Sequence, residues 1–149
     1  MAAREQLTEK ILAAKRRLAL KWSTIAAALG TGSVVMYTAA LLGQFPLTAE
    51  EASKAVVLLE LDEDDALLLV ESPTRGAGVV MPPTDPLIYR FYELVQNYGA
   101  TWKTLIEEEF GDGIMSAIDF NMSITRQADP KGDRVKIEMS GKFLPFKRY

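Results

Sequence analysis

The chain has 149 residues, of which 48% are hydrophobic and 25% charged, and its formal net charge is −3. This length fits one domain or two small ones, and the composition is that of a soluble globular protein. A mildly acidic chain has no long-range attraction to nucleic acid or to anionic membranes, so we expect neither as a partner.

The sequence contains neither cysteine nor histidine. The absence of cysteine excludes disulfides, thiolate catalysis and cysteine-ligated metals. The absence of histidine excludes Ser-His-Asp catalysis and nearly every zinc site. Any chemistry must therefore use arginine, lysine, carboxylates, hydroxyl groups or a bound cofactor. A chain without cysteine also fits a reducing compartment, and we expect a cytoplasmic protein.

The first ten residues carry several charges, which argues against a secretory signal. Residues 25–42 are uncharged and approach the length of a membrane span, which needs about 20 strongly apolar residues. This stretch is rich in alanine and is interrupted by the turn sequence GTGS at residues 30–33. We therefore expect no membrane-spanning segment.

The first half of the chain predicts a bundle of five short helices. Apolar and basic residues alternate at helical spacing over residues 7–20. Ser23, Ser33 and Thr48 are each placed to cap one of the next three helices. The acidic residues 62–65 begin the fifth helix. They lack the alternating ligands and the glycine bend of a calcium loop, so we expect no metal there.

Two of these helices, joined by a glycine-containing turn over residues 23–42, form a helix-turn-helix pattern. A DNA-binding version needs side chains in its second helix that reach base edges and phosphates. Residues 34–39, VVMYTA, offer almost none, and Lys21 is the only basic residue nearby. The pattern therefore favours a packing unit. A DNA-binding regulator with a C-terminal oligomerisation module remains the alternative function.

Residues 72–83, SPTRGAGVVMPP, contain three prolines and two glycines, which is typical of a linker. We place the linker at residues 73–83. It would separate an N-terminal helical bundle, residues 1–72, from a C-terminal domain, residues 84–149.

The C-terminal domain is predicted to open with an amphipathic helix capped by Asp85. At about 100° per residue, the apolar side chains of residues 87–95 form one broad face. Arg90 and Glu93 lie together on the opposite side, three residues apart, so their side chains are neighbours. By spacing alone they are an exposed ion pair of little energetic consequence.

The rest of this domain predicts a second helix and a hairpin. Gly99 is expected to end the first helix, and residues 101–109 to form another. Apolar and polar residues then alternate over residues 118–125, as in a half-buried strand. The turn sequence at 129–132 and the alternation over 135–139 complete a probable hairpin. Since a lone hairpin is marginal in water, we expect it to pair with another subunit.

Ser116 stands just before this strand. In an alternating strand it shares a face with Ile118 and Phe120, so its hydroxyl is predicted to face the covered side. A buried hydroxyl needs a hydrogen-bond partner. We therefore predict an α+β fold class, with a helical bundle that resembles a helix-turn-helix domain and a small helix-plus-hairpin domain that pairs with another copy of the chain.

The C-terminal half contains the stretches RFYE, the following Gly99, FGDGIMSAIDF and the ending GKFLP. Together these stretches resemble the motifs of the cyanase family, the cyanate hydratases. The N-terminal half agrees more loosely, through TAALLGQ and LDEDDALLL, and the linker RGAGVVMPP departs from the family's forms. In that family the catalytic residues are the Arg and Glu of RFYE and the Ser of GDGI-x-SAI. They correspond here to Arg90, Glu93 and Ser116.

The resemblance implies a lyase that combines cyanate with bicarbonate to give carbamate and carbon dioxide. Carbamate then decomposes to ammonia and a second carbon dioxide, a reaction of cyanate detoxification and nitrogen metabolism. Bicarbonate is a co-substrate, and no metal or organic cofactor is expected. The family also implies a homodecamer, a ring of five dimers, with its sites between subunits.

The resemblance also suggests a role for each matched residue. Arg90 is expected to bind and neutralise the anions. Ser116 is expected to donate a hydrogen bond to an anion or to charge that develops in the transition state. Glu93 is expected to orient Arg90 or a proton-carrying group, because a carboxylate would repel the substrates.

Overall fold

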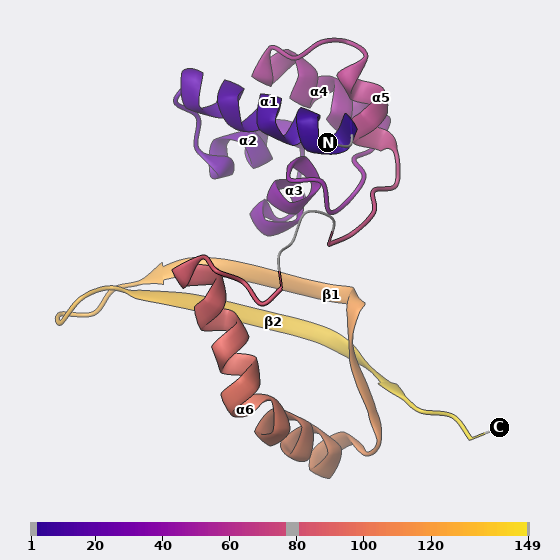
Figure 1. Cartoon of the computed structure of the whole chain (residues 1–149), viewed down its shortest axis with the longest axis vertical. Coiled ribbons are helices and arrows are strands. Elements are labelled where there is room, and N and C mark those ends of the chain that lie inside the picture. Colours follow the sequence, from indigo (N-terminus) through magenta and orange to yellow (C-terminus); the bar gives the residue numbers. More distant parts are fainter. Residues whose placement is uncertain (1–2, 77–80, 149) are drawn as a thin grey trace. The chain divides into compact units, whose positions relative to one another are not determined.

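The computed structural model describes residues 3–76 and 81–148 of the chain (Figure 1). Five helices come first, followed by a long helix and two strands that pair in a two-stranded sheet. This order confirms the predicted α+β class. The elements are α1 (Ala3–Arg17), α2 (Trp22–Leu29), α3 (Val34–Leu41), α4 (Ala49–Leu59), α5 (Asp65–Val70), α6 (Pro86–Phe110), β1 (Gly113–Gln127) and β2 (Arg134–Pro145).

The hydrophobic core lies among α1 to α5. Every buried hydrophobic side chain of the described residues falls between Leu7 and Leu69. Each of the five helices contributes at least one side chain that is less than 2% exposed, such as Ile11 from α1 and Leu59 from α4. The bundle therefore buries its own apolar faces. Over the described residues no single helix is long and apolar enough to cross a membrane, although α2 and α3, bent by 95°, meet that criterion as a pair.

Two of the predicted caps in the bundle are confirmed and one is wrong. Ser33 Oγ accepts from the Met36 N–H at 3.1 Å at the start of α3. Thr48 forms a full capping box with Glu51 at the start of α4. Ser23 caps nothing, because α2 already begins at Trp22. The indole of Trp22 packs against the core and lies 5.1 Å from Lys15 Nζ, so tertiary packing outweighs the local capping signal.

The turn between α2 and α3 is fastened to α4 by Tyr37. The Tyr37 hydroxyl donates to Glu51 Oε1 at 2.8 Å and accepts from the Gly32 N–H at 3.3 Å. A Cβ on Gly32 would lie 2.9 Å from the Tyr37 ring, so the turn needs glycine for space. The pKa of Glu51 is lowered, chiefly by its hydrogen bond from the Thr48 backbone, so the bonds hold a carboxylate. The helix-turn-helix pattern thus acts here as a packing unit.

The residues after α5 turn back onto the loop between α3 and α4. The Gly76 N–H donates to Gln44 Oε1 at 2.8 Å, and the Arg75 guanidinium carbon lies 5.2 Å from the centre of the Phe45 ring. These contacts hold the first part of the predicted linker, residues 73–83. Residues 77–80 of that linker lie outside the described residues.

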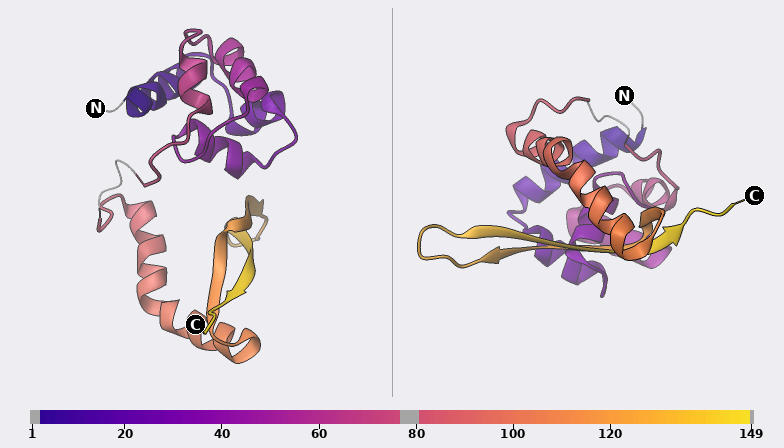
Figure 2. Two further views of the ribbon diagram at one scale, coloured as in Figure 1. Left: turned by 90° about the vertical axis from the view of Figure 1, so that its right-hand side faces the viewer. Right: turned by 90° about the horizontal axis from the view of Figure 1, so that it is seen from below.

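The long helix α6 corrects the prediction of two helices. Its start is as expected, because Asp85 Oδ1 accepts from two backbone N–H groups at 2.9 Å. Gly99 does not end it. A glycine inside a helix is destabilising by only about 1 kcal/mol, and the rings of Tyr98 and Trp102 stack across this position, with centroids 6.5 Å apart. Figure 2 shows that α6 is bent rather than broken.

Removal of the Tyr37 hydroxyl tests its role in the bundle. Tyr37→Phe should lower the free energy of unfolding by about 1–3 kcal/mol, since a hydrogen bond to a charged group is lost. Ser53→Ala is the control, because the Ser53 hydroxyl is exposed and bonds only within its own helix. Denaturant unfolding at one protein concentration measures both. Equal stability of the two variants would contradict this role.

Candidate active site

Arg90 and Glu93 lie one turn apart near the start of α6. Arg90 Nη1 is 3.0 Å from Glu93 Oε2, as the spacing predicted. The two side chains are 64% and 42% exposed. An ion pair this open adds little to stability. The bond uses only part of the guanidinium fork, so the remaining N–H groups can bind an anion.

The side chain of Ser116 is buried, unlike those of Arg90 and Glu93. Ser116 is 4% exposed, and its Oγ accepts from the N–H groups of Ile118 and Asp119, both at 3.0 Å. Because Oγ is the acceptor in both bonds, its proton can be donated to a third group. Two donors on Oγ also polarise the hydroxyl and make it a stronger donor.

Ser116 is buried, as predicted. The prediction placed it on a covered face with Ile118 and Phe120. In the single chain Ile118 is 96% exposed and Phe120 is half-buried, so alternation along β1 does not by itself account for the burial of Ser116 there. The hydrogen bonds from the Ile118 and Asp119 amides to Ser116 Oγ were not predicted, because strand periodicity does not show bonds between a side chain and its own strand.

The hydrogen bonds of the three predicted site residues are local. Arg90 and Glu93 bond to each other, and Ser116 bonds to residues that follow it in β1. Ser116 stands six positions beyond the end of α6, whereas Arg90 is near the beginning. Within residues 3–76 and 81–148, no hydrogen bond or ion pair joins Ser116 to the other two.

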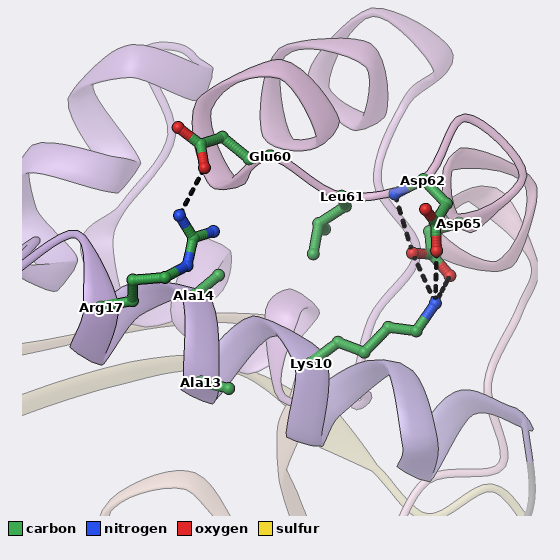
Figure 3. A pocket seen from close by; sticks show the side chains of 8 residues that line it. All are labelled: Lys10, Ala13, Ala14, Arg17, Glu60, Leu61, Asp62 and Asp65. Atoms are coloured by element: carbon green, nitrogen blue, oxygen red, sulfur yellow. Dashed lines mark hydrogen bonds and ion pairs between the residues drawn. The ribbon is translucent and has the colours of Figure 1, made fainter.

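The sequence reasoning did not anticipate a charged pocket in the helical bundle, shown in Figure 3. Lys10 Nζ lies 2.9 Å from Asp62 Oδ2 and 3.1 Å from Asp65 Oδ2. Arg17 pairs with Glu60 across the same pocket. The hydrogen bonds that Lys10 donates to Asp62, and then those to Asp65, raise the pKa of Lys10. These paired charges tie α1 to the segment between α4 and α5, which is a structural role.

No metal-binding arrangement is found in the part of the chain that the structure describes. Within those residues, no three or more side chains of histidine, cysteine, aspartate or glutamate gather closely enough to hold an ion. In the acidic run, Asp65 is 6% exposed and is paired with Lys10.

Known proteins resemble this chain over nearly its full length. One family model, the N-terminal part of cyanate hydratase, matches residues 4–73. Another, the cyanate lyase C-terminal domain, matches residues 80–148. The chain belongs to the cyanate hydratase family. The resemblance seen in RFYE, FGDGIMSAIDF and GKFLP is therefore confirmed.

Individual members of this family are similar in both sequence and fold. The cyanate hydratase of Ralstonia pickettii (strain 12J) is 56% identical over 146 residues, which are 98% of this chain and 99% of that one. That of Dechloromonas aromatica (strain RCB) is 54% identical over the same length. The crystal structure of cyanase from T. urticae superimposes with a TM-score of 0.80 at 35% identity, covering 93% of this chain and 96% of the other.

Family membership accounts for two features of the chain. The α+β order of helices, long helix and hairpin is that of a solved cyanase. The two family models also leave residues 74–79 between them, inside the predicted linker. The domain bounds at 1–72 and 84–149 stay a prediction.

Hydrogen exchange tests the geometry around Ser116. Ser116→Ala should speed exchange of the Ile118 and Asp119 amides, because it removes the acceptor that both share. Ser123→Ala is the control, since Ser123 is an exposed serine of the same strand. Unchanged exchange at both amides in Ser116→Ala would contradict the hydrogen bonds described here.

Proposed function

We propose that this cyanate hydratase acts at a site made of Arg90, Glu93 and Ser116. The activity is assigned because both halves of the chain match the cyanate hydratase family. The site assignment is supported by the chemistry of two residues that match the family's motifs, because both can donate hydrogen bonds to an anion. One is the open guanidinium of Arg90, and the other is the buried hydroxyl of Ser116.

The reaction balances without a cofactor. A bicarbonate oxygen bonds to the carbon of cyanate, and the cyanate nitrogen takes up two protons, one from bicarbonate and one from solution. The bond between that oxygen and the former bicarbonate carbon then breaks. The products are carbon dioxide and carbamate, and carbamate takes up a further proton and decomposes to ammonia and a second carbon dioxide.

The main barrier to this reaction is electrostatic, because both substrates are anions. Two unit charges about 4 Å apart repel by roughly 4 kcal/mol at an effective dielectric near 20. The Arg90 guanidinium offsets this repulsion, and its planar fork suits the oxygens of bicarbonate. Holding the two anions together in one orientation supplies much of the remaining acceleration.

Glu93 and Ser116 have different roles in this proposal. Glu93 orients the guanidinium through its 3.0 Å bond to Arg90, or holds a proton-carrying group. Ser116 donates its hydroxyl proton to an oxygen on which charge develops. Since Ser116 Oγ accepts from the amides of Ile118 and Asp119, its own proton remains for donation to such an oxygen.

Such a site must be shielded from water, and we infer that other copies of the chain bury it. Anions react faster where water is excluded, yet Arg90 is 64% exposed. No residue of α6 is buried. The proposed assembly is a homodecamer built as five dimers, each dimer intertwined through its hairpins, in the cytoplasm.

Ammonia release from cyanate, measured with and without bicarbonate, tests the reaction. Release should require bicarbonate. Arg90→Lys should lower kcat/KM by about 10²–10³-fold, as expected when a fixed donor to developing charge is lost. Lysine keeps the charge but lacks the fork.

The matched control is Arg126→Lys, since Arg126 is 82% exposed and forms an ion pair with Asp133, next to the hairpin turn. That variant should keep wild-type kinetics. Release that is equally fast without bicarbonate would argue against the reaction. Near-normal kinetics of Arg90→Lys would remove Arg90 from the site.

A further inference from the structure

The two strands of the hairpin come very close together beside Ser116. A Cβ placed on Gly141 of β2 would overlap the carbonyl oxygen of Ser116 and lie 2.7 Å from Met115 Cγ. The overlapped oxygen belongs to the backbone, so it cannot turn away as a flexible side chain would. Any residue larger than glycine at position 141 must therefore move the backbone of Ser116.

A second glycine lies on the facing strand. A Cβ on Gly113 of β1 would overlap the carbonyl oxygen of Leu144 and the ring of Phe143. Each strand thus carries one glycine whose added Cβ would overlap a backbone oxygen of the other strand. A glycine inside a strand often marks such an approach or a bulge.

Space, and not backbone conformation, is the reason for glycine at these two positions. The glycines that adopt a left-handed backbone include Gly111 and Gly132, but not Gly113 or Gly141. The φ angle at position 141 would therefore allow an alanine. Only the contacts of its Cβ would be unfavourable. The effect of the substitution would be local to its neighbour on β1.

That neighbour, Ser116, is held by local hydrogen bonds. Its Oγ accepts from the N–H groups of Ile118 and Asp119. A shift of the Ser116 backbone would therefore also move its Oγ relative to these two amides. Glycine at position 141 leaves the space in which this arrangement forms.

We infer that Gly141 is a positioning residue that sets where the Ser116 hydroxyl lies in the cyanate reaction. The inference rests on the proposed function, because Gly141 acts through Ser116 and touches neither substrate. Gly141 is the glycine of the GKFLP ending, so it gives that motif a physical role beside the active serine.

The test compares four purified full-length chains: wild type, Gly141→Ala, Ser116→Ala and the double variant. Gly141→Ala should lower kcat by about 10–100-fold, since a displacement near 1 Å at a catalytic group has an effect of this size. It should also speed hydrogen exchange at the Ile118 and Asp119 amides. In the Ser116→Ala background the same substitution should lower kcat by less than about twofold, because the group it positions is already gone.

The control is Gly99→Ala, in which the added Cβ meets only Val95 Cγ1 at an ordinary 3.7 Å. Its kcat should equal that of wild type. Gly113→Ala is a second variant, expected to lower kcat in the same direction because it moves β2 at the adjacent contact.

Each outcome separates the inference from the function on which it rests. Wild-type activity in Ser116→Ala would remove Ser116 from the proposed site. A loss in Ser116→Ala with wild-type kcat in Gly141→Ala would overturn the inference alone. So would equal losses from Gly141→Ala in both backgrounds. If neither glycine variant folds, the glycines serve the hairpin itself, and the inference is again overturned.

Discussion

The uncovered apolar surface of α6 and the hairpin is the constraint on which the rest of this structure depends. The helical bundle buries its own core, but no residue of α6 is buried and Ile118 is 96% exposed. A two-stranded hairpin is marginal in water by itself. Covering each half-exposed side chain would contribute roughly 1 kcal/mol. In the proposed function, association of several copies stabilises this half of the chain and excludes water from Arg90.

Local hydrogen bonds hold each residue of the proposed site. Glu93 bonds to the guanidinium of Arg90 once and leaves the other N–H groups of Arg90 open. The amides of Ile118 and Asp119 donate to Ser116 Oγ and leave its proton to donate. In the proposed function, short-range contacts orient the cation and the donor, and a second chain brings the two together.

Much of the fold follows from local sequence signals, because the caps at Ser33, Thr48 and Asp85 depend on residues two or three positions away. Two local signals gave wrong predictions because packing outweighed them. Ser23 was expected to cap α2, which begins at Trp22, and Gly99 was expected to end a helix, but α6 continues through it. The site could not be predicted from spacing, since Arg90 and Glu93 look like any exposed helical pair. Their assignment to the site comes from the family motifs. The close approach at Gly141 was not predicted, because the alternation indicated a strand only over residues 135–139 and does not show which backbone atoms face a glycine.

Subunit mixing tests the shared site most directly. Arg90→Ala and Ser116→Ala chains, each expected to keep only a small residual activity alone, are unfolded together and refolded as a mixture. If Arg90 and Ser116 of one site come from different chains, roughly a quarter of the sites in a random mixture are complete and activity returns. If both come from one chain, every site lacks one of them. A mixed oligomer without activity, or a fully active monomer of the wild-type chain, would contradict this account.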